Sequence, residues 1–96
     1  MPLIPAAIPA VEDARLSRVR FEMKDGSRPV TVLVMKPALE RFDGAPPKGR
    51  SLETFKRNRR CFERIASEKY SRGHLEEPGV ICIRPIDLAL VRTDAR

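Results

Sequence analysis

The sequence predicts a small α+β domain in which the elements follow one another in the order β-β-α-α-β. Polar and apolar residues alternate at 17–24, which is the period of a half-buried strand. After Asp25-Gly26, valines alternate with Thr31, Leu33 and Met35 at 30–35. A basic amphipathic segment at residues 51–73 has the period of a helix. A short apolar run with β-branched residues follows at 80–83. We expect the hairpin and the last strand to form one antiparallel sheet, with a short and a long helix packed on one face.

The first two strands are joined by Asp25-Gly26, a strong signal for a two-residue hairpin turn. A turn at these two residues sets Phe21 opposite Val30, and the apolar residues of both strands then fall on one face. Pro29 has no N–H to donate to a neighbouring strand. We therefore expect the second strand to lie at an edge of the sheet.

The two expected helices differ in length. Residues 36–42 predict a short helix, because Pro37 suits the first helical turn, and a loop rich in Gly and Pro follows it. The long helix is expected to begin at Ser51, a good N-cap, and to end before Gly73, which suits the position just after a helix. Arg59 falls near the apolar stripe of this helix, where a long cation needs a partner or must extend into solvent.

The predicted core combines the inward-facing residues of the hairpin, the apolar stripes of the helices and the last strand. A core of this kind fits the size of the chain, since about 100 residues can fold as a single domain. Its expected members are Val19, Phe21, Val30, Val32, Leu39, Phe42, Phe55, Phe62, Ala66, Ile81 and Ile83.

The chain of 96 residues is expected to hold one domain, at residues 16–91. Residues 1–15 are rich in Pro and Ala and predict a flexible arm, whose apolar side chains could dock on the sheet or on a second subunit. The arm lacks the basic start and sustained apolar run of a signal peptide. No stretch approaches the ~20 apolar residues of a membrane span. Residues 92–96 are expected to fray, and two cysteines without a disulfide framework favour a cytoplasmic location.

The order and spacing of these residues resemble a small bacterial family, domain of unknown function fourteen-eighty-eight. The resemblance covers roughly residues 17–88 and implies a small α+β domain, found mainly in proteobacteria, with no established activity. It implies no catalytic residues. The residues that carry the resemblance are Val19-Arg20-Phe21, Ala38-Leu39-Glu40-Arg41-Phe42, Phe55, Arg59, Phe62, Ala66, Tyr70, Arg72-Gly73 and Asp87-Leu88.

Catalytic and cofactor signatures are missing from the sequence. Cys61, His74 and Cys82 do not have the paired spacing of a zinc site, and no third residue orients His74 toward a cysteine nucleophile. The adjacent Glu76 and Glu77 fall in an expected turn, and the glycines are isolated, so that no phosphate-binding loop is predicted. We expect no enzymatic activity, no cofactor, no metal and no small-molecule substrate.

Two interaction surfaces remain as hypotheses. The first is the sheet face away from the helices, where Leu33 and Met35 form a partly apolar surface. It favours a protein-interaction module that binds a partner or forms a homodimer, and this is the leading interpretation.

The alternative is a non-catalytic protein that binds nucleic acid through the basic long helix. The net charge of +6 favours an acidic partner. Interleaved glutamates and the lack of spare aromatic residues for base stacking weigh against it. The expected phosphate contacts are Lys48, Arg50, Lys56, Arg57, Arg60 and Arg64.

Overall fold

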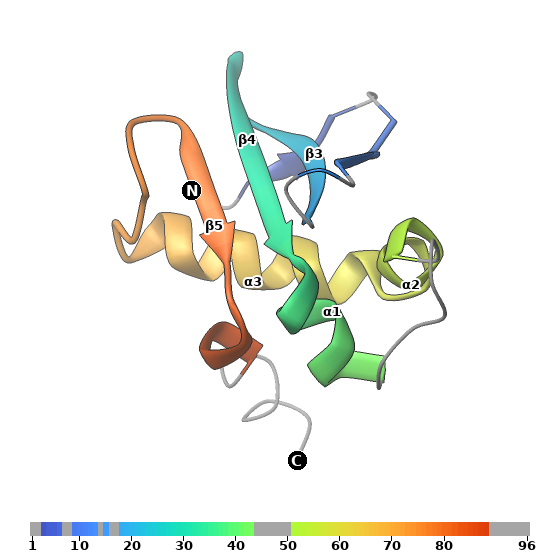
Figure 1. Cartoon of the computed structure of the whole chain (residues 1–96). Helices are drawn as coiled ribbons and strands as arrows, with labels where there is room; N and C mark the ends of the chain where they lie inside the picture. Colours follow the sequence, from blue (N-terminus) through green and yellow to red (C-terminus); the bar gives the residue numbers. More distant parts are fainter. Residues whose placement is uncertain (1–2, 7–8, 14, 16–17, 44–50, 89–96) are drawn as a thin grey trace.

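A computed structural model describes residues 3–6, 9–13, 15, 18–43 and 51–88, with the backbone alone at Phe42, Asp43 and Ser51. The fold is α+β, as predicted, and the order of the main elements is also confirmed (Figure 1). The elements are β1 (Ile4–Pro5), β2 (Val11–Asp13), β3 (Arg18–Asp25), β4 (Arg28–Met35), α1 (Lys36–Asp43), α2 (Ser51–Arg57), α3 (Arg59–Ser71), β5 (Val80–Ile83) and the 3-10 turn η2 (Pro85–Leu88).

The sheet is mixed, with strand order β1-β3-β4-β5 and with β2 also paired to β3. The pairs on either side of β3 are antiparallel, but β5 runs parallel to β4. The prediction of an antiparallel sheet is therefore wrong for the last strand. The chain leaves the end of β4 through the helices and returns along α3 to the other end of the sheet, which is the crossover that parallel strands require.

β4 lies between β3 and β5, so the expectation of an edge strand is also wrong. Pairing with β5 covers only Thr31 to Val34. Pro29 precedes these residues, and its missing N–H therefore costs β4 no hydrogen bond to β5.

The hairpin between β3 and β4 turns one residue later than expected. Asp25 still pairs with Arg28, so the turn consists of Gly26 and Ser27, with Gly26 at a φ of 64°. Phe21 consequently lies opposite Val32 rather than Val30. Because this shift in pairing is by two residues, every side chain keeps its predicted face.

The N-terminal segment is paired with β3 where the structure describes it. Ile4 lies opposite Lys24 in β1, and Val11 lies opposite Arg20 in β2. Leu3 is buried in the core. The sequence allowed the apolar residues of this segment to dock on the sheet or on a second subunit, and the described residues dock on the sheet.

The expected long helix is two helices, α2 and α3, separated at Asn58. In Figure 1 the two do not share an axis, and α2 turns away from α3. The Asn58 amide Nδ2 donates to the carbonyl oxygen of Thr54 at 3.0 Å. A side chain that competes for backbone groups in this way disfavours a continuous helix.

The end of α3 follows the prediction at Gly73, which has a φ of 73°. The N–H of His74 donates to the carbonyl of Lys69 at 2.8 Å, and that of Gly73 donates to Tyr70 at 3.1 Å. This pair of bonds is the Schellman motif, in which glycine takes the left-handed position without strain.

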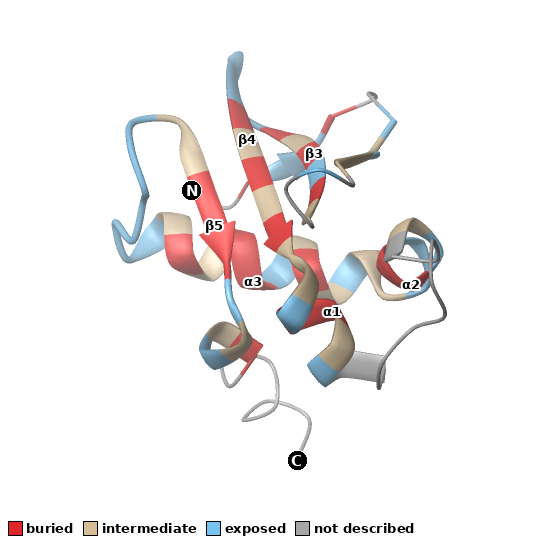
Figure 2. Ribbon diagram, viewed as in Figure 1, coloured by how far each residue is buried: buried red, intermediate tan, exposed pale blue. Residues whose placement is uncertain are grey.

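The core lies between the sheet and the helices, and Figure 2 shows buried residues alternating with less buried ones along β4. Every predicted core residue whose side chain is described is buried. Phe42 lies outside the described side chains. The ring centroids of Phe21 and Phe55 are 4.8 Å apart, and those of Phe55 and Phe62 are 5.8 Å apart. The core also takes in Met23, Val34, Ala38, Ile65 and Leu88, which were not predicted.

Candidate interaction surfaces

One face of the sheet packs on the helices, and the other is covered by no helix among the described residues. Alternation along the strands decides which side chains lie there: Val19, Phe21 and Met23 point into the core, so Arg20 and Glu22 point away from it. We call this surface the open sheet face. It includes Ile4, Val11, Asp13, Arg18, Arg20, Glu22, Lys24, Thr31, Leu33, Met35, Val80 and Cys82.

Leu33 and Met35, the predicted contact residues, are both half-buried on this face. Leu33 is near its centre, because it pairs with Arg20 on one side and with Cys82 on the other. Val11 adds an apolar side chain beyond Arg20 and is 49% exposed. Apolar side chains thus extend across the sheet on either side of one arginine.

The open sheet face carries charges of both signs. The Thr31 hydroxyl donates to the Glu22 carboxylate at 3.0 Å, and Arg18 Nε lies 3.8 Å from the Asp13 carboxylate. Arg20 has no ion pair within the described part of the chain. It borders a hollow of about 290 Å³, which is lined by Val11, Glu12, Asp13, Arg15 and Arg20.

The outer edge of β5 is protected against pairing with another strand. The carbonyl of Gly79 accepts a bond from Thr31, so Val80 and Cys82 direct their backbone groups away from β4. Val80 donates to the Glu77 carbonyl at 2.9 Å and accepts from Glu76 at 3.0 Å. Occupied backbone groups cannot template a further strand.

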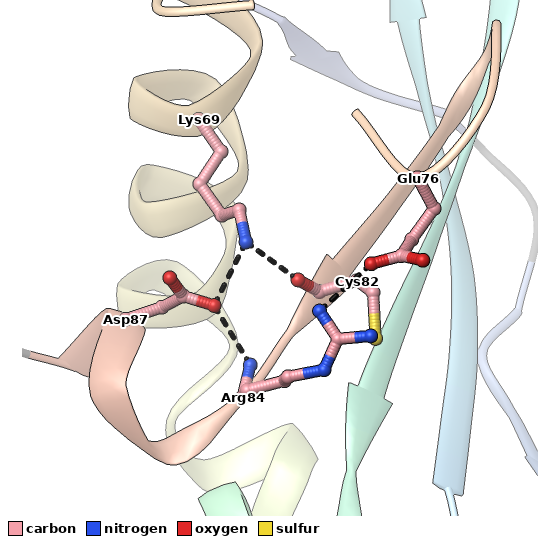
Figure 3. A network of polar contacts seen from close by, with 5 residues as sticks. All are labelled: Lys69, Glu76, Cys82, Arg84 and Asp87. Carbon is pink, nitrogen blue, oxygen red and sulfur yellow. Dashed lines mark hydrogen bonds and ion pairs between the residues drawn. The ribbon is translucent and has the colours of Figure 1, made fainter. Parts of the chain in front are cut away.

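The last outward carbonyl of β5 is occupied by a lysine (Figure 3). Lys69 is only 7% exposed, and its Nζ donates to the Cys82 carbonyl and to Asp87 Oδ2, each at 2.8 Å. Asp87 Oδ2 also accepts from the backbone N–H of Arg84 at 2.8 Å. Lys69 therefore joins α3, β5 and η2, a role that the sequence analysis did not predict. Its position four residues after the apolar Ile65, on the buried side of α3, is the signal that could have shown it.

Arg84 continues this network on the surface, where its Nη1 lies 2.7 Å from Glu76 Oε1. The hydrogen bond from the Arg84 guanidinium lowers the pKa of Glu76 below its usual value of 4.5 and raises the pKa of Arg84. Both side chains are about half exposed, so this pair contributes little to stability at neutral pH.

The predicted basic residues are only partly brought together. Lys56, Arg57 and Arg60 line a hollow of about 460 Å³ at the junction of α2 and α3, with Asn58, Arg59, Cys61 and Glu63. Arg64 is exposed one turn further along α3 and is not part of the hollow's lining. Lys48 and Arg50 lie outside the described residues.

Arg59 lies near the core and is paired with an acidic side chain, Glu63. Its Nε donates to Glu63 Oε2 at 2.9 Å. Its guanidinium carbon also lies 5.6 Å from the ring centroid of Phe21 and 5.7 Å from that of Phe55. A guanidinium over aromatic rings is stabilised by cation–π attraction, so Arg59 closes the core at the junction.

Neither cysteine is in a disulfide: Cys61 is half-buried and Cys82 is buried. Burial raises the pKa of the Cys82 thiol above its usual value of 9.0, which disfavours the reactive thiolate. Across the described ranges, no three potential metal ligands of the His, Cys, Asp or Glu type lie together. Nor is any described helix long and apolar enough to cross a membrane.

Comparison with known proteins finds relatives without an assigned activity. Residues 9–83 match the family described as protein of unknown function, DUF1488. Among solved structures, the chain is similar to a crystal structure of a protein of unknown function from the DUF1488 family of Shewanella loihica, with a TM-score of 0.74 and 17% identity. That match covers 85% of this chain and 91% of the other, and at this identity the likeness concerns the fold alone. No curated protein matches the chain.

Proposed function

We infer the function from the surfaces of the chain itself, because the chain belongs to the DUF1488 family, whose members are described as proteins of unknown function. We propose that it is a non-catalytic interaction module that binds a second copy of itself through the open sheet face. The observation that carries this proposal is the apolar row across that face, where Val11 and Leu33 flank Arg20, which has no ion pair with any described residue. Contiguous apolar side chains on a surface are typical of interaction sites.

The choice of a second copy as the partner is supported by the charges along β3. Arg20 and Glu22 are two residues apart and both point out of the open sheet face. If a two-fold axis ran across the strands between them, Arg20 of each copy would face Glu22 of the other. An isologous interface needs this kind of self-complementary surface. The unpaired Arg20 would then gain the partner that it lacks within the described part of its own chain.

The size of the surface indicates weak association. β3 and β4 have eight residues each, which makes them about 26 Å long, and neighbouring strands lie about 4.8 Å apart. A face of this size is near the lower limit of specific interfaces, about 600 Å² per partner. We therefore expect a dissociation constant in the micromolar range, about 8 kcal/mol or less of binding free energy.

Pairing through a sheet edge is a less suitable route to a dimer. β4 is a central strand, and three outward backbone groups of β5, the N–H and carbonyl of Val80 and the carbonyl of Cys82, are engaged by Glu77, Glu76 and Lys69. These contacts support association through a face rather than through added strands. The free thiols of the chain support a cytoplasmic setting for the module, because cytosolic proteins keep their cysteines reduced.

The test compares two Leu→Asp variants by light scattering and sedimentation at protein concentrations from about 10 μM to 1 mM, a range chosen to span the expected micromolar dissociation constant. We expect the wild type to become dimeric with rising concentration and Leu33→Asp to stay monomeric. Leu75→Asp is the matched control, because Leu75 is 37% exposed and lies outside the open sheet face, and it should dimerise like the wild type. A monomeric wild type at 1 mM, or dimers of Leu33→Asp, would contradict the proposal.

A charge exchange tests the geometry of the pairing separately from the apolar contact. Arg20→Glu should weaken the dimer, because it places acidic side chains opposite each other across the axis. The double variant Arg20→Glu with Glu22→Arg restores opposite charges and should recover most of the lost affinity. Failure of the double variant to recover dimerisation, in a protein that still folds by circular dichroism, would refute the two-fold arrangement.

A further inference from the structure

A second surface, remote from the open sheet face, has the properties of an anion site. The hollow at the α2–α3 junction has a volume of about 460 Å³, and four of its seven lining residues are cations: Lys56, Arg57, Arg59 and Arg60. We propose that this hollow binds the phosphodiester backbone of a nucleic acid. The site does not depend on the proposed dimer, since no residue of the open sheet face lines it.

Part of the positive charge in the hollow is available to a ligand. Its one acid, Glu63, is already neutralised by Arg59 at 2.9 Å. Lys56 and Arg60 are exposed and have no ion pair with any residue that the structure describes. Two exposed cations such as these on a concave surface create a positive potential there, and this potential attracts phosphate groups.

The ends of two helices meet at the hollow. Asn58 precedes α3, but its side chain donates to Thr54 in α2 and makes no capping bond to α3. The first residues of this 13-residue helix, Arg59 and Arg60, line the hollow. The positive end of the α3 dipole and the negative end of the seven-residue α2 therefore meet in this region, and the side chains rather than the backbone provide the positive potential.

The arrangement fits a polymer better than a lipid surface. Arg64 is exposed one turn beyond Arg60, about 6 Å along the helix axis, so the cations continue past the hollow and can meet successive phosphates. A membrane-binding surface needs exposed apolar side chains beside its cations. The large exposed apolar residues of the described chain are Ile4, Val11, Leu75 and Ile86, and none of them lines the hollow.

The contacts would be to phosphates and not to bases. The three aromatic residues nearest the junction, Phe21, Phe55 and Phe62, are buried in the core and cannot stack on bases. Binding that rests on phosphate contacts alone is independent of sequence and falls steeply with salt. Contacts from Lys56 and Arg60 alone should contribute about −1.8 to the slope of log affinity against log salt for duplex DNA.

The experiment measures fluorescence anisotropy of a labelled 20-base-pair DNA duplex, titrated with the full chain at several salt concentrations. We expect Lys56→Gln with Arg60→Gln to lower the affinity at least about tenfold at low salt and to reduce the magnitude of the salt slope by about 1.8, since two phosphate contacts are lost. Both side chains are exposed, and an unchanged melting temperature will show that the variant is folded.

A matched control separates the hollow from the net charge of +6. Lys24→Gln with Arg28→Gln removes two exposed cations at the hairpin end of the sheet. The Tyr70 hydroxyl bonds to Asp25 there, about 18 Å along α3 from Asn58. We expect this variant to keep most of the affinity. No binding at low salt, equal losses in both variants, or binding to anionic lipid vesicles without binding to DNA would overturn the proposal.

Discussion

Replacement of Lys69 by Met tests whether a single buried cation holds the last strand and the 3-10 turn against α3. Methionine nearly matches the aliphatic length of lysine and keeps its packing, but the Cys82 carbonyl and the Asp87 carboxylate each lose a donor at 2.8 Å. Hydrogen bonds to charged groups contribute about 1.5–3 kcal/mol each, and a buried acceptor left unsatisfied costs about 1–3 kcal/mol. Asp87 keeps its bond from the Arg84 N–H, so we expect a net loss of about 2–4 kcal/mol.

The assay is urea unfolding followed by circular dichroism, with Arg72→Met as the matched control. Arg72 directly follows the same helix and also pairs with an acid, but its side chain is 55% exposed and its Nε is 3.7 Å from Glu68. Its replacement should change stability by less than about 0.5 kcal/mol. A double-mutant cycle with Asp87→Asn should give a coupling energy of about 1–2 kcal/mol between Lys69 and Asp87. Equal unfolding midpoints for Lys69→Met and Arg72→Met would refute this account of the buried lysine.

Three further outcomes are expected. Phe62→Ala should lower the free energy of unfolding by about 3–5 kcal/mol in urea, and an unchanged midpoint would show that its ring is not core. The Arg84 guanidinium lowers the pKa of Glu76 below 4.5. The pair therefore stabilises the native state at pH values above 4.5, and this contribution is lost as the pH falls through the lowered pKa. The melting temperatures of wild type and Glu76→Gln should therefore differ slightly at about pH 7 and converge at about pH 2; a difference that grows in acid would contradict the assignment. Because burial raises the pKa of the Cys82 thiol, iodoacetamide should modify Cys61 first by peptide mass spectrometry, and faster labelling of Cys82 would be inconsistent with its burial.

The sequence predicts the faces of the hairpin better than its register. The Gly26 position needs a positive φ and is recognisable from Asp25-Gly26, but nothing local decides whether Asp25 or Ser27 completes the turn. The pairing of Asp25 with Arg28 moves the partner of Phe21 by two residues. Face assignments survive such an even shift, because side chains alternate with a period of two.

The direction of β5 and the break at Asn58 depend on tertiary contacts. The apolar run of β5 is equally compatible with either strand direction. The direction is set by the end of the sheet at which α3 ends. Asn58 lies within a sequence whose apolar stripe continues on both sides of it, so periodicity predicts one helix. The bond from its side chain to Thr54 is visible only in the folded chain.

The candidate surfaces were predictable to different extents. Leu33 and the outward direction of Arg20 follow from strand alternation. The contribution of Val11 to the open sheet face does not, because it depends on the pairing of the N-terminal segment with β3. The hollow among Lys56 and Arg60 arises from the helix break, which periodicity did not predict.

Amide NMR shifts recorded over a hundredfold dilution series test most directly whether the open sheet face is the surface that self-associates. We expect concentration-dependent shifts at residues of this face, with Arg20 and Leu33 near the centre, and constant shifts along α2 and α3. Shifts that stay constant throughout, or that change over the helices while the sheet is unaffected, would contradict the proposed function.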